Sequence, residues 1–471
     1  MGDFSRPRYG REVGIITLCF WGMAAAAEST HELPDLNGPQ STPSVTEITM
    51  PSGPLTIDQT MDLAFARNPD LRAAAERIGE AEARVQEATS AFYPEASARV
   101  SYTHSNDPAR AFSMIVAQRR FSFEDVDIND PGYQEDFRPE IGATWSLYRG
   151  GQDMARKKAA ELGVEVSALE RGAVRNQLAA AVASAYYALA AAPEQVKVAE
   201  RSIGSVESGL KQAQVRLSEG TGLKSDVLSL EARLAEAKEA KLRAENAVEL
   251  ARSALQTLLA LPTETRLEIR AESGSGLPPP KRDFSEMLKQ ALAERPEMQA
   301  AARQVEMRTQ ELDAAKGARL PRVNAFASYG QNHPHPDLAL NRDNFTVGVT
   351  AEVDLFTGFR TSARIAQAEH RLAEAQAHQE QARLAIEEEV KKAHLIYQEA
   401  VARMKVTEAA VGAAEEALRL VGEQYRGGTA TVTRYLEAET ARAEARSRDI
   451  AADYEARSAL AGVKRATGYW K

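Results

Sequence analysis

Cysteine is almost missing from this chain of 471 residues. The single one, Cys19, lies near the N-terminus, so the rest of the chain has no disulfide framework, cysteine metal site or cysteine nucleophile. Aromatic residues are scarce, at 6%, whereas charged residues make up 27%. After the N-terminal segment no run of about 18 apolar residues occurs, which is the length that a membrane-spanning helix needs. These absences exclude a bundle of apolar membrane helices.

Catalytic motifs are missing as well. No glycine-rich phosphate loop precedes a Lys-Ser or Lys-Thr pair, and the serines lack a convincing histidine partner. We therefore expect no enzymatic activity and no cofactor. His333 and His335 flank Pro334. Two histidines without a third ligand do not predict a metal site, and we keep metal binding there only as an alternative. The net charge of −9 argues against nucleic acid as a partner.

Residues 1–27 are typical of a secretory signal peptide, because three arginines precede an apolar stretch that ends in four alanines. The alternatives are a membrane anchor and a lipoprotein signal acylated at Cys19, which the bulky Leu18 disfavours. Residues 28–54 are rich in Pro and Ser and predict an extended N-terminal segment.

An internal repeat dominates the rest of the chain. Pro69 and Pro296 are 227 positions apart (296 − 69), and each precedes an acidic and then an apolar residue. Gly220 and Gly428, each followed by threonine, are 208 apart (428 − 220). We therefore predict a first structural repeat at 55–262, a linker at 263–282 and a second repeat at 283–471. The first copy has an extra loop between about 105 and 136.

Each copy contains two segments of about ten residues in which apolar and polar residues alternate. The predicted strands cover about 95–104 and 136–148 in the first copy, and about 321–330 and 345–356 in the second. This length and alternation are typical of tilted strands that cross a bilayer with an apolar outer face. The polar face would place these charged side chains in the lumen: Arg99, Arg138, Glu140, Arg322, Glu352 and Asp354. The alternative is a soluble sheet packed on a helix.

Four strands cannot close a barrel around an open pore, and unpaired strand edges are not tolerated in lipid. The sheet must therefore be completed by other chains. Three copies would give twelve strands, which is within the range of outer-membrane barrels.

Long helices follow the strands in both copies. Apolar positions repeat in steps of four and three, which predicts coiled-coil helices at about 149–218 and 223–261, and at about 358–426 and 430–468. Pro193 should kink or interrupt the first of them. Gly220 and Gly428 predict tight turns, and Thr221 and Thr429 are expected to begin the following helices.

Three short segments carry a family resemblance: LYRGG at 147–151, LFTGFR at 355–360 and YRGGT at 425–429. In this order, and in a duplicated chain, they resemble the TolC-type outer-membrane efflux proteins from about residue 55 to 470. The resemblance implies a homotrimer with a twelve-stranded β-barrel, four strands per chain, continued by a long α-helical barrel of coiled-coil hairpins. It also implies an outer-membrane location with a large periplasmic extension, and partners in a periplasmic adaptor and an inner-membrane pump or ABC exporter.

The family's tunnel narrows at the helix tips, where acidic residues ring the constriction. Carried over to this chain, the periplasmic gate would include Asp226, Arg434, Glu437 and Tyr425. Arg434 departs from the family pattern, which has an acid there, so an Asp226–Arg434 ion pair that holds the closed state is a hypothesis. Turn residues Gly220, Thr221, Gly428 and Thr429 would dock the adaptor.

We therefore expect a passive exit duct of a tripartite efflux or type I secretion system. The alternative is a periplasmic coiled-coil scaffold, or an adaptor-like interaction protein without a barrel. The alternating strands favour the duct, since a scaffold has no use for them.

Overall fold

The computed structural model describes residues 53–124, 126–270, 283–336 and 342–470 of the chain. The expected signal peptide at 1–27, Cys19 and nearly all of the expected extended segment at 28–54 lie outside these residues. The same is true of 271–282, the second part of the expected linker. The compact unit described below falls within residues 51–471.

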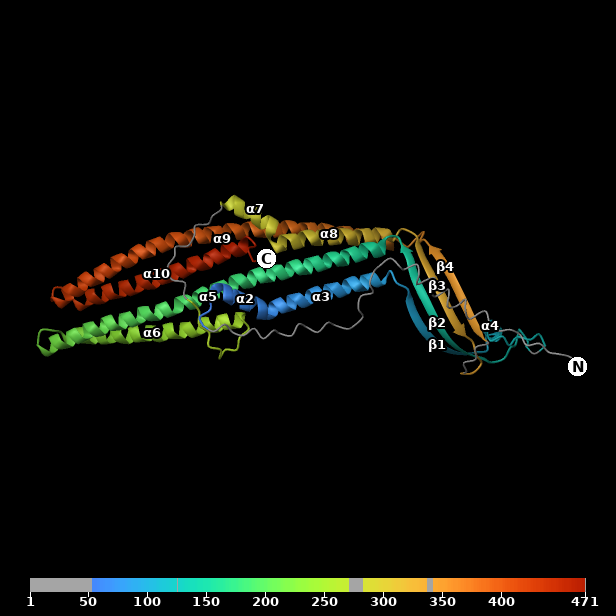
Figure 1. Ribbon diagram of the computed structural model, residues 1–471, viewed down its shortest axis with the longest axis horizontal. Helices are drawn as coiled ribbons and strands as arrows, with labels where there is room; N and C mark the ends of the chain where they lie inside the picture. The colour runs from blue at the N-terminus through green and yellow to red at the C-terminus, as the bar shows by residue number, and fades with distance from the viewer. Residues whose placement is uncertain (1–52, 125, 271–282, 337–341, 471) are drawn as a thin grey trace. The chain divides into compact units, whose positions relative to one another are not determined.

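Eight of the helices form two series of equal lengths, 11, 22, 67 and 35 residues (Figure 1). The first series is α2 (Ile57–Arg67), α3 (Pro69–Ser90), α5 (Gln152–Ser218) and α6 (Lys224–Leu258). The second is α7 (Phe284–Glu294), α8 (Pro296–Gly317), α9 (Arg360–Arg426) and α10 (Val432–Ala466). This equality supports a duplication.

The starts of α3 and α8 follow from their sequences. Pro69 and Pro296 occupy the first turns, as predicted, where a missing N–H costs nothing. Asn68 caps α3 by accepting a hydrogen bond from the N–H of Asp70 at 2.9 Å. The equivalent residue before α8 is Arg295, which is 4% exposed and forms ion pairs with Glu297 and Glu389 instead.

Pro193 was expected to kink or interrupt the first long helix, and the interruption is not found. Helix α5 runs without a break from Gln152 to Ser218 with Pro193 inside it. Pro193 is exposed, whereas Leu189, Ala190 and Ala192 beside it are buried. Packing of the flanking turns therefore holds the helix together, while the proline ring points to the open side, where the lost backbone hydrogen bond can be replaced by water.

The four strands form one antiparallel sheet in the order β1-β2-β3-β4, and they are drawn in Figure 1 beside the ends of the helices. They are β1 (Glu95–Ser105), β2 (Gln134–Arg149), β3 (Arg322–Gln331) and β4 (Asp343–Glu352). Strand β4 is shorter than the expected 345–356, so Asp354 lies beyond its end. Among the described residues, β1 and β4 each pair along one side only.

The register separates the sheet into a polar and an apolar face. Arg99 lies opposite Glu140, and Arg322 lies opposite Glu352, all on one face. The other face presents apolar side chains that are mostly 57–66% exposed, namely Val100, Tyr102, Ile141, Phe345, Val347 and Val349. Phe326 interrupts the polar face, where it fits because its partner Gly348 has no side chain. The sheet thus has one face suited to water and one suited to lipid.

The corner between β2 and α5 explains the LYRGG segment. Gly150 has a φ of 63°, and a side chain there would overlap the carbonyl oxygen of Gly317. Gly151 has a φ of 77°. Glycine is favoured at both positions because other residues are strained at positive φ, and at Gly150 a side chain is also too bulky for the close approach. The corner therefore brings the start of α5 against the end of α8.

The extra loop of the first copy contains a helix that was not expected, α4 (Pro108–Ala117). Gln118, at its end, donates hydrogen bonds to the Glu135 carbonyl and to Asp136. His333 is buried beside Gln331, whereas His335 lies 3.5 Å from Glu135. The two histidines thus contact different partners, and the described residues contain no group of three His, Cys, Asp or Glu arranged to hold a metal.

None of the described helices combines the length and the apolar composition that crossing a membrane requires.

Candidate functional site

The two helix-tip turns are built in the same way, 208 residues apart. Gly220 and Gly428 have φ values of 77° and 78°. The N–H of Thr221 donates to the carbonyl of Arg216, and the N–H of Thr429 donates to that of Gln424, each at 2.9 Å. This pattern is the glycine-dependent C-cap expected at these turns, and it satisfies carbonyl groups at the end of α5 and of α9.

The expectation that Thr221 and Thr429 begin the next helices is wrong. Their hydroxyl groups bond back to the same carbonyls, those of Arg216 at 3.2 Å and of Gln424 at 3.1 Å. Helix α6 begins after Leu223, which makes no side-chain cap, and α10 begins after Thr431, which caps Arg434. Thr221 and Thr429 therefore form hydrogen bonds with the end of the preceding helix, and they do not cap the following helix.

Near the tips, the two helical hairpins are joined to each other. Arg216 of α5 donates to the carbonyls of Tyr425 and Arg426, and its guanidinium lies 4.9 Å from the Tyr425 ring centre. Tyr425 stacks on Tyr435 of α10, with ring centres 5.2 Å apart. Both tyrosines are buried within an apolar cluster, and burial raises the pKa of each hydroxyl, so both remain neutral at neutral pH.

Tyr435 also reaches across to α5. Its hydroxyl donates to the carbonyl of Ser205 at 2.8 Å, and its ring lies on Gly209, where a side chain would come within 2.9 Å of it. The Gly209 position therefore has to be small for α10 to approach α5. Sequence reasoning singled out Tyr425 but missed Tyr435, Arg216 and Gly209.

The charged gate candidates lie at the same end of the helices. Asp226 is half-buried in the first turn of α6 and lies close enough to influence Tyr425 electrostatically. Arg434 pairs with Glu437 at 3.6 Å, and both side chains are more than 60% exposed. Within one chain the described residues contain no Asp226–Arg434 pair, so that part of the gate hypothesis is not met in a single subunit.

A buried carboxylate next to the tip was also missed. Glu439 of α10 is 0% exposed and lies 3.5 Å from both Arg233 of α6 and Arg442 of α10. A buried carboxylate needs such partners because desolvation of an unpaired charge is costly. No periodic signal identifies it, since Arg233 lies 206 residues away.

The charged residues expected in the barrel lumen that lie within the strands share one sheet face, and most of the expected set forms ion pairs. Arg138 lies 2.8 Å from Glu140, which faces Arg99 across the strands. Arg322 lies 3.3 Å from Glu352 and 3.2 Å from Asp354. This face therefore carries compensated charge, and it can line a water-filled passage without a large single-sign field.

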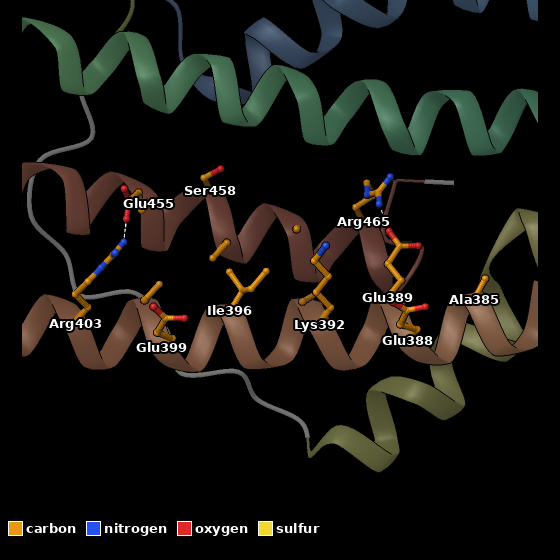
Figure 2. Close-up of a pocket in the computed structure, with 14 residues that line it drawn as sticks. Ala385, Glu388, Glu389, Lys392, Ile396, Glu399, Arg403, Glu455, Ser458 and Arg465 are labelled. Atoms are coloured by element: carbon orange, nitrogen blue, oxygen red, sulfur yellow. Dashed lines mark hydrogen bonds and ion pairs between the residues drawn. The ribbon is translucent and has the colours of Figure 1, made fainter.

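A cavity of about 670 Å³ lies between α9 and α10 (Figure 2). Figure 2 shows Arg403 directed toward Glu455, and Arg465 directed toward Glu389, and both are ion pairs. Small residues such as Ala393, Ala400 and Gly462 line the space between them. These two ion pairs join α9 to α10 across the cavity.

Comparison with known proteins identifies the family. The outer membrane efflux protein family matches residues 60–261 and 287–469, most of the chain and both repeats. The chain belongs to this family. The predicted TolC-type resemblance is therefore confirmed. As a member of this family, the chain is an outer-membrane efflux protein.

Individual relatives are more distant. Protein CyaE of Bordetella pertussis is 25% identical over 342 residues, which are 72% of this chain and 68% of CyaE. The alkaline protease secretion protein AprF of Pseudomonas aeruginosa is 26% identical over 200 residues, 42% of each chain. The cobalt-zinc-cadmium resistance protein CzcC of Cupriavidus metallidurans is 25% identical over 65% of this chain and 64% of its own length. The matched part is thus less than two thirds of AprF and of CzcC.

Solved structures share the fold. The outer-membrane channel OprN has a TM-score of 0.74 at 22% identity, covering 88% of this chain and 89% of OprN. The outer membrane protein VceC of Vibrio cholerae has a TM-score of 0.72 at 21% identity, covering 88% and 96%. The helices and the sheet are therefore arranged as in known outer-membrane channels.

Proposed function

We propose that three copies of this chain form one duct, with a twelve-stranded β-barrel in the outer membrane and a helical barrel that extends into the periplasm. The observation that carries the proposal is the four-stranded sheet, which has an exposed apolar face, a polar face and two open edges. In lipid both edges must be paired, and pairing β1 of one copy with β4 of the next closes the sheet.

The duct is passive, and its energy comes from its partners. We propose that a periplasmic adaptor docks at the tip turns that contain Gly220, Thr221, Gly428 and Thr429, and that an inner-membrane pump or ABC exporter delivers the cargo. The matched relatives include proteins named for protease secretion and for metal resistance, which supports a role in either type I secretion or efflux.

The signal peptide at 1–27 and the two repeats at 55–262 and 283–471 are part of this proposal. The equal helix lengths and the equivalent tip turns support the duplication.

The mass of the purified mature protein in detergent tests the trimer. We expect three copies per particle, heat-modifiable migration on a gel, and a conducting channel in planar bilayers. A protein that is soluble without detergent and runs as a single chain would contradict the proposal. In that case the scaffold alternative would take its place.

We further propose that the constriction lies at the tips, with Asp226, Arg434, Glu437 and Tyr425 around it. Arg434→Glu should change conductance and ion selectivity, because it reverses a charge at the narrowest point in all three subunits. Arg448→Glu is a matched control, since Arg448 lies on the same helix, is equally exposed and is also 3.6 Å from a glutamate. Equal effects of the two substitutions, or no effect of Arg434→Glu, would contradict a gate at this place.

A further inference from the structure

A second cleft, of about 770 Å³, lies along α3, α5, α8 and α9 at their ends nearest the sheet. Helix α5 begins three residues after β2 ends, and α3 ends five residues before β1 begins. Six arginines line the cleft, and we call them the arginine collar: Arg77, Arg84, Arg156, Arg308, Arg364 and Arg371. The acidic residues that line it are two glutamates, Glu80 and Glu311.

The two glutamates neutralise only part of the collar. Glu80 pairs with Arg84 at 2.6 Å, and Glu311 pairs with Arg308 at 2.7 Å. Three further arginines line the cleft from α3 and α9, namely Arg77, Arg364 and Arg371. All three are exposed, and none has a carboxylate within ion-pair distance among the described residues.

Arg156 is also poorly compensated. It donates to Gln152 at 3.2 Å and lies 4.0 Å from Asp153, which Arg149 already holds at 3.0 Å. The collar therefore carries an excess of positive charge that faces solvent.

The opposite side of α5 differs in charge. Lys158 is two residues from Arg156, about 200° around the helix. It pairs with Glu161 at 3.6 Å, and Glu165 on the same side pairs with Arg303 of α8 at 2.9 Å. On α5, the excess of positive charge therefore lies on the side that forms the cleft.

In the proposed duct, the side of the helical layer that carries the cleft faces the interior of the tube. The inference below rests on that proposed function. A layer of side-by-side helices that closes into a tube is concave toward its interior. We therefore assign the side that carries the cleft, which is lined by four neighbouring helices, to the interior of the tube. The arginine collar then surrounds the water-filled passage just beneath the barrel, where its charge acts locally whatever the net charge of the whole chain.

We propose that the arginine collar binds the carboxylates of an acidic polypeptide in transit through the duct. Guanidinium groups hold carboxylates with two parallel hydrogen bonds, which suits them to this cargo. Arg77 and Arg84, and likewise Arg364 and Arg371, are seven residues apart, about 10 Å along a helix. An extended chain advances about 3.3 Å per residue, so acidic residues three positions apart match this spacing. A small dicarboxylate spans less and would engage one arginine of each pair.

Single-channel recording with decaglutamate tests the collar. The peptide is added on the barrel side, from which it reaches the collar without passing the helix tips. We expect interruptions of the current that shorten as salt rises, and none with decalysine. The double variant Arg364→Gln/Arg371→Gln should shorten the interruptions about tenfold, because each of three subunits loses two charges.

Arg156→Gln and Lys158→Gln form a matched pair on one helix, since their side chains are 56% and 55% exposed. Only Arg156→Gln should shorten the interruptions. Equal effects of the two, or none from the double variant, would overturn the collar. Glutarate at the same carboxylate concentration should be far weaker than decaglutamate, and equal strength would overturn the assignment to a polypeptide.

Fluorescence anisotropy measures the binding of labelled decaglutamate to the purified protein. This measurement tests the arginine collar independently of the proposed duct. Binding that falls in the double variant supports the collar even if the protein forms no channel, whereas the missing channel would count against the proposed function. A conducting trimer that does not bind decaglutamate would overturn the collar alone.

Discussion

Tyr435 illustrates how single residues hold the tip region together. It is a residue of α10 that stacks on Tyr425 of α9 and donates a hydrogen bond to Ser205 of α5. Burial raises the pKa of its hydroxyl, which therefore remains a donor at neutral pH. One side chain thus connects three long helices next to the gate candidates.

Tyr435→Phe should loosen this connection while keeping the ring in place. Loss of the hydrogen bond to Ser205 costs about 1 kcal/mol, equal to about a fivefold change in a local opening equilibrium. We expect faster amide hydrogen exchange near the tips of α5 and α10, measured by mass spectrometry. Tyr469→Phe is the control, because Tyr469 is exposed and lies at the other end of α10. Unchanged exchange in Tyr435→Phe would show that the hydroxyl does not fasten the hairpins.

Arg295 has a similar role at the other end of α10. It holds Glu297 at 2.8 Å and Glu389 at 2.5 Å, and Glu389 also pairs with Arg465. Burial alone would raise the pKa of Glu297, but the hydrogen bond from Arg295, the positive charges of Arg295 and Arg465 and a backbone hydrogen bond together lower the pKa below its ordinary value of 4.5. A lowered folded pKa gives stability above pH 4.5, which is lost as the pH falls through the folded value.

Arg295→Met should destabilise the fold at pH 7 by about 2 kcal/mol, after allowance for solvent screening of the partly exposed carboxylates. The difference from the parent protein should shrink as the pH falls from 4.5 through the folded pKa of Glu297, because protonation of Glu297 removes the charge that Arg295 pairs with. Thermal unfolding followed by circular dichroism at several pH values measures both effects. Arg303→Met, which removes an exposed arginine with two glutamate partners, should change little. A pH-independent loss in Arg295→Met would indicate that packing, and not charge, is responsible.

At the scale of the elements, the tip turns depend on a glycine with positive φ. Gly428 has a φ of 78°, and a side chain there would meet nothing within 4 Å. Gly204, inside α5, also has open space around it but has no positive φ. Because neither position is crowded, a comparison of the two glycines isolates the effect of backbone strain.

Alanine at these two positions should have opposite effects. Gly428→Ala should lower the stability by about 1 kcal/mol, because alanine is strained in the left-handed region. Gly204→Ala should raise it by about 0.5–1 kcal/mol, because glycine is unfavourable inside a helix. Thermal unfolding of the two variants gives the signs directly. A gain of stability in Gly428→Ala would mean that the turn is not held in the conformation described.

The elements could be predicted well from the sequence, and their contacts could not. Alternate residues of a strand point to opposite faces, so the position of Arg99 and Glu140 on one face followed from the pattern alone. The Tyr435–Ser205 and Arg216–Tyr425 contacts join residues more than 200 positions apart, and they depend on how the hairpins pack. Pro193 was misjudged for the same reason, because packing outweighed local propensity.

At the scale of the whole molecule, the proposed barrel requires that one face of the sheet contacts lipid and the other contacts water. Val347 and Thr346 are neighbours near the middle of β4, and their side chains point to opposite faces. Val347 is 61% exposed on the apolar face, whereas Thr346 lies on the polar face opposite Ser328. In the proposed barrel one position contacts lipid and the other contacts water in the lumen.

Arginine at these adjacent positions should therefore have very different consequences. Val347→Arg places a charge in lipid, which costs about 2–4 kcal/mol per subunit near the bilayer midplane, so assembled protein in the outer membrane should fall sharply. Thr346→Arg should assemble normally and change the conductance, because the new charge lies in the lumen. Heat-modifiable gel migration of membrane extracts measures assembly, and planar-bilayer recording measures conductance. If both variants assembled equally well, the apolar face would not contact lipid, and the strands would belong to a sheet outside the membrane.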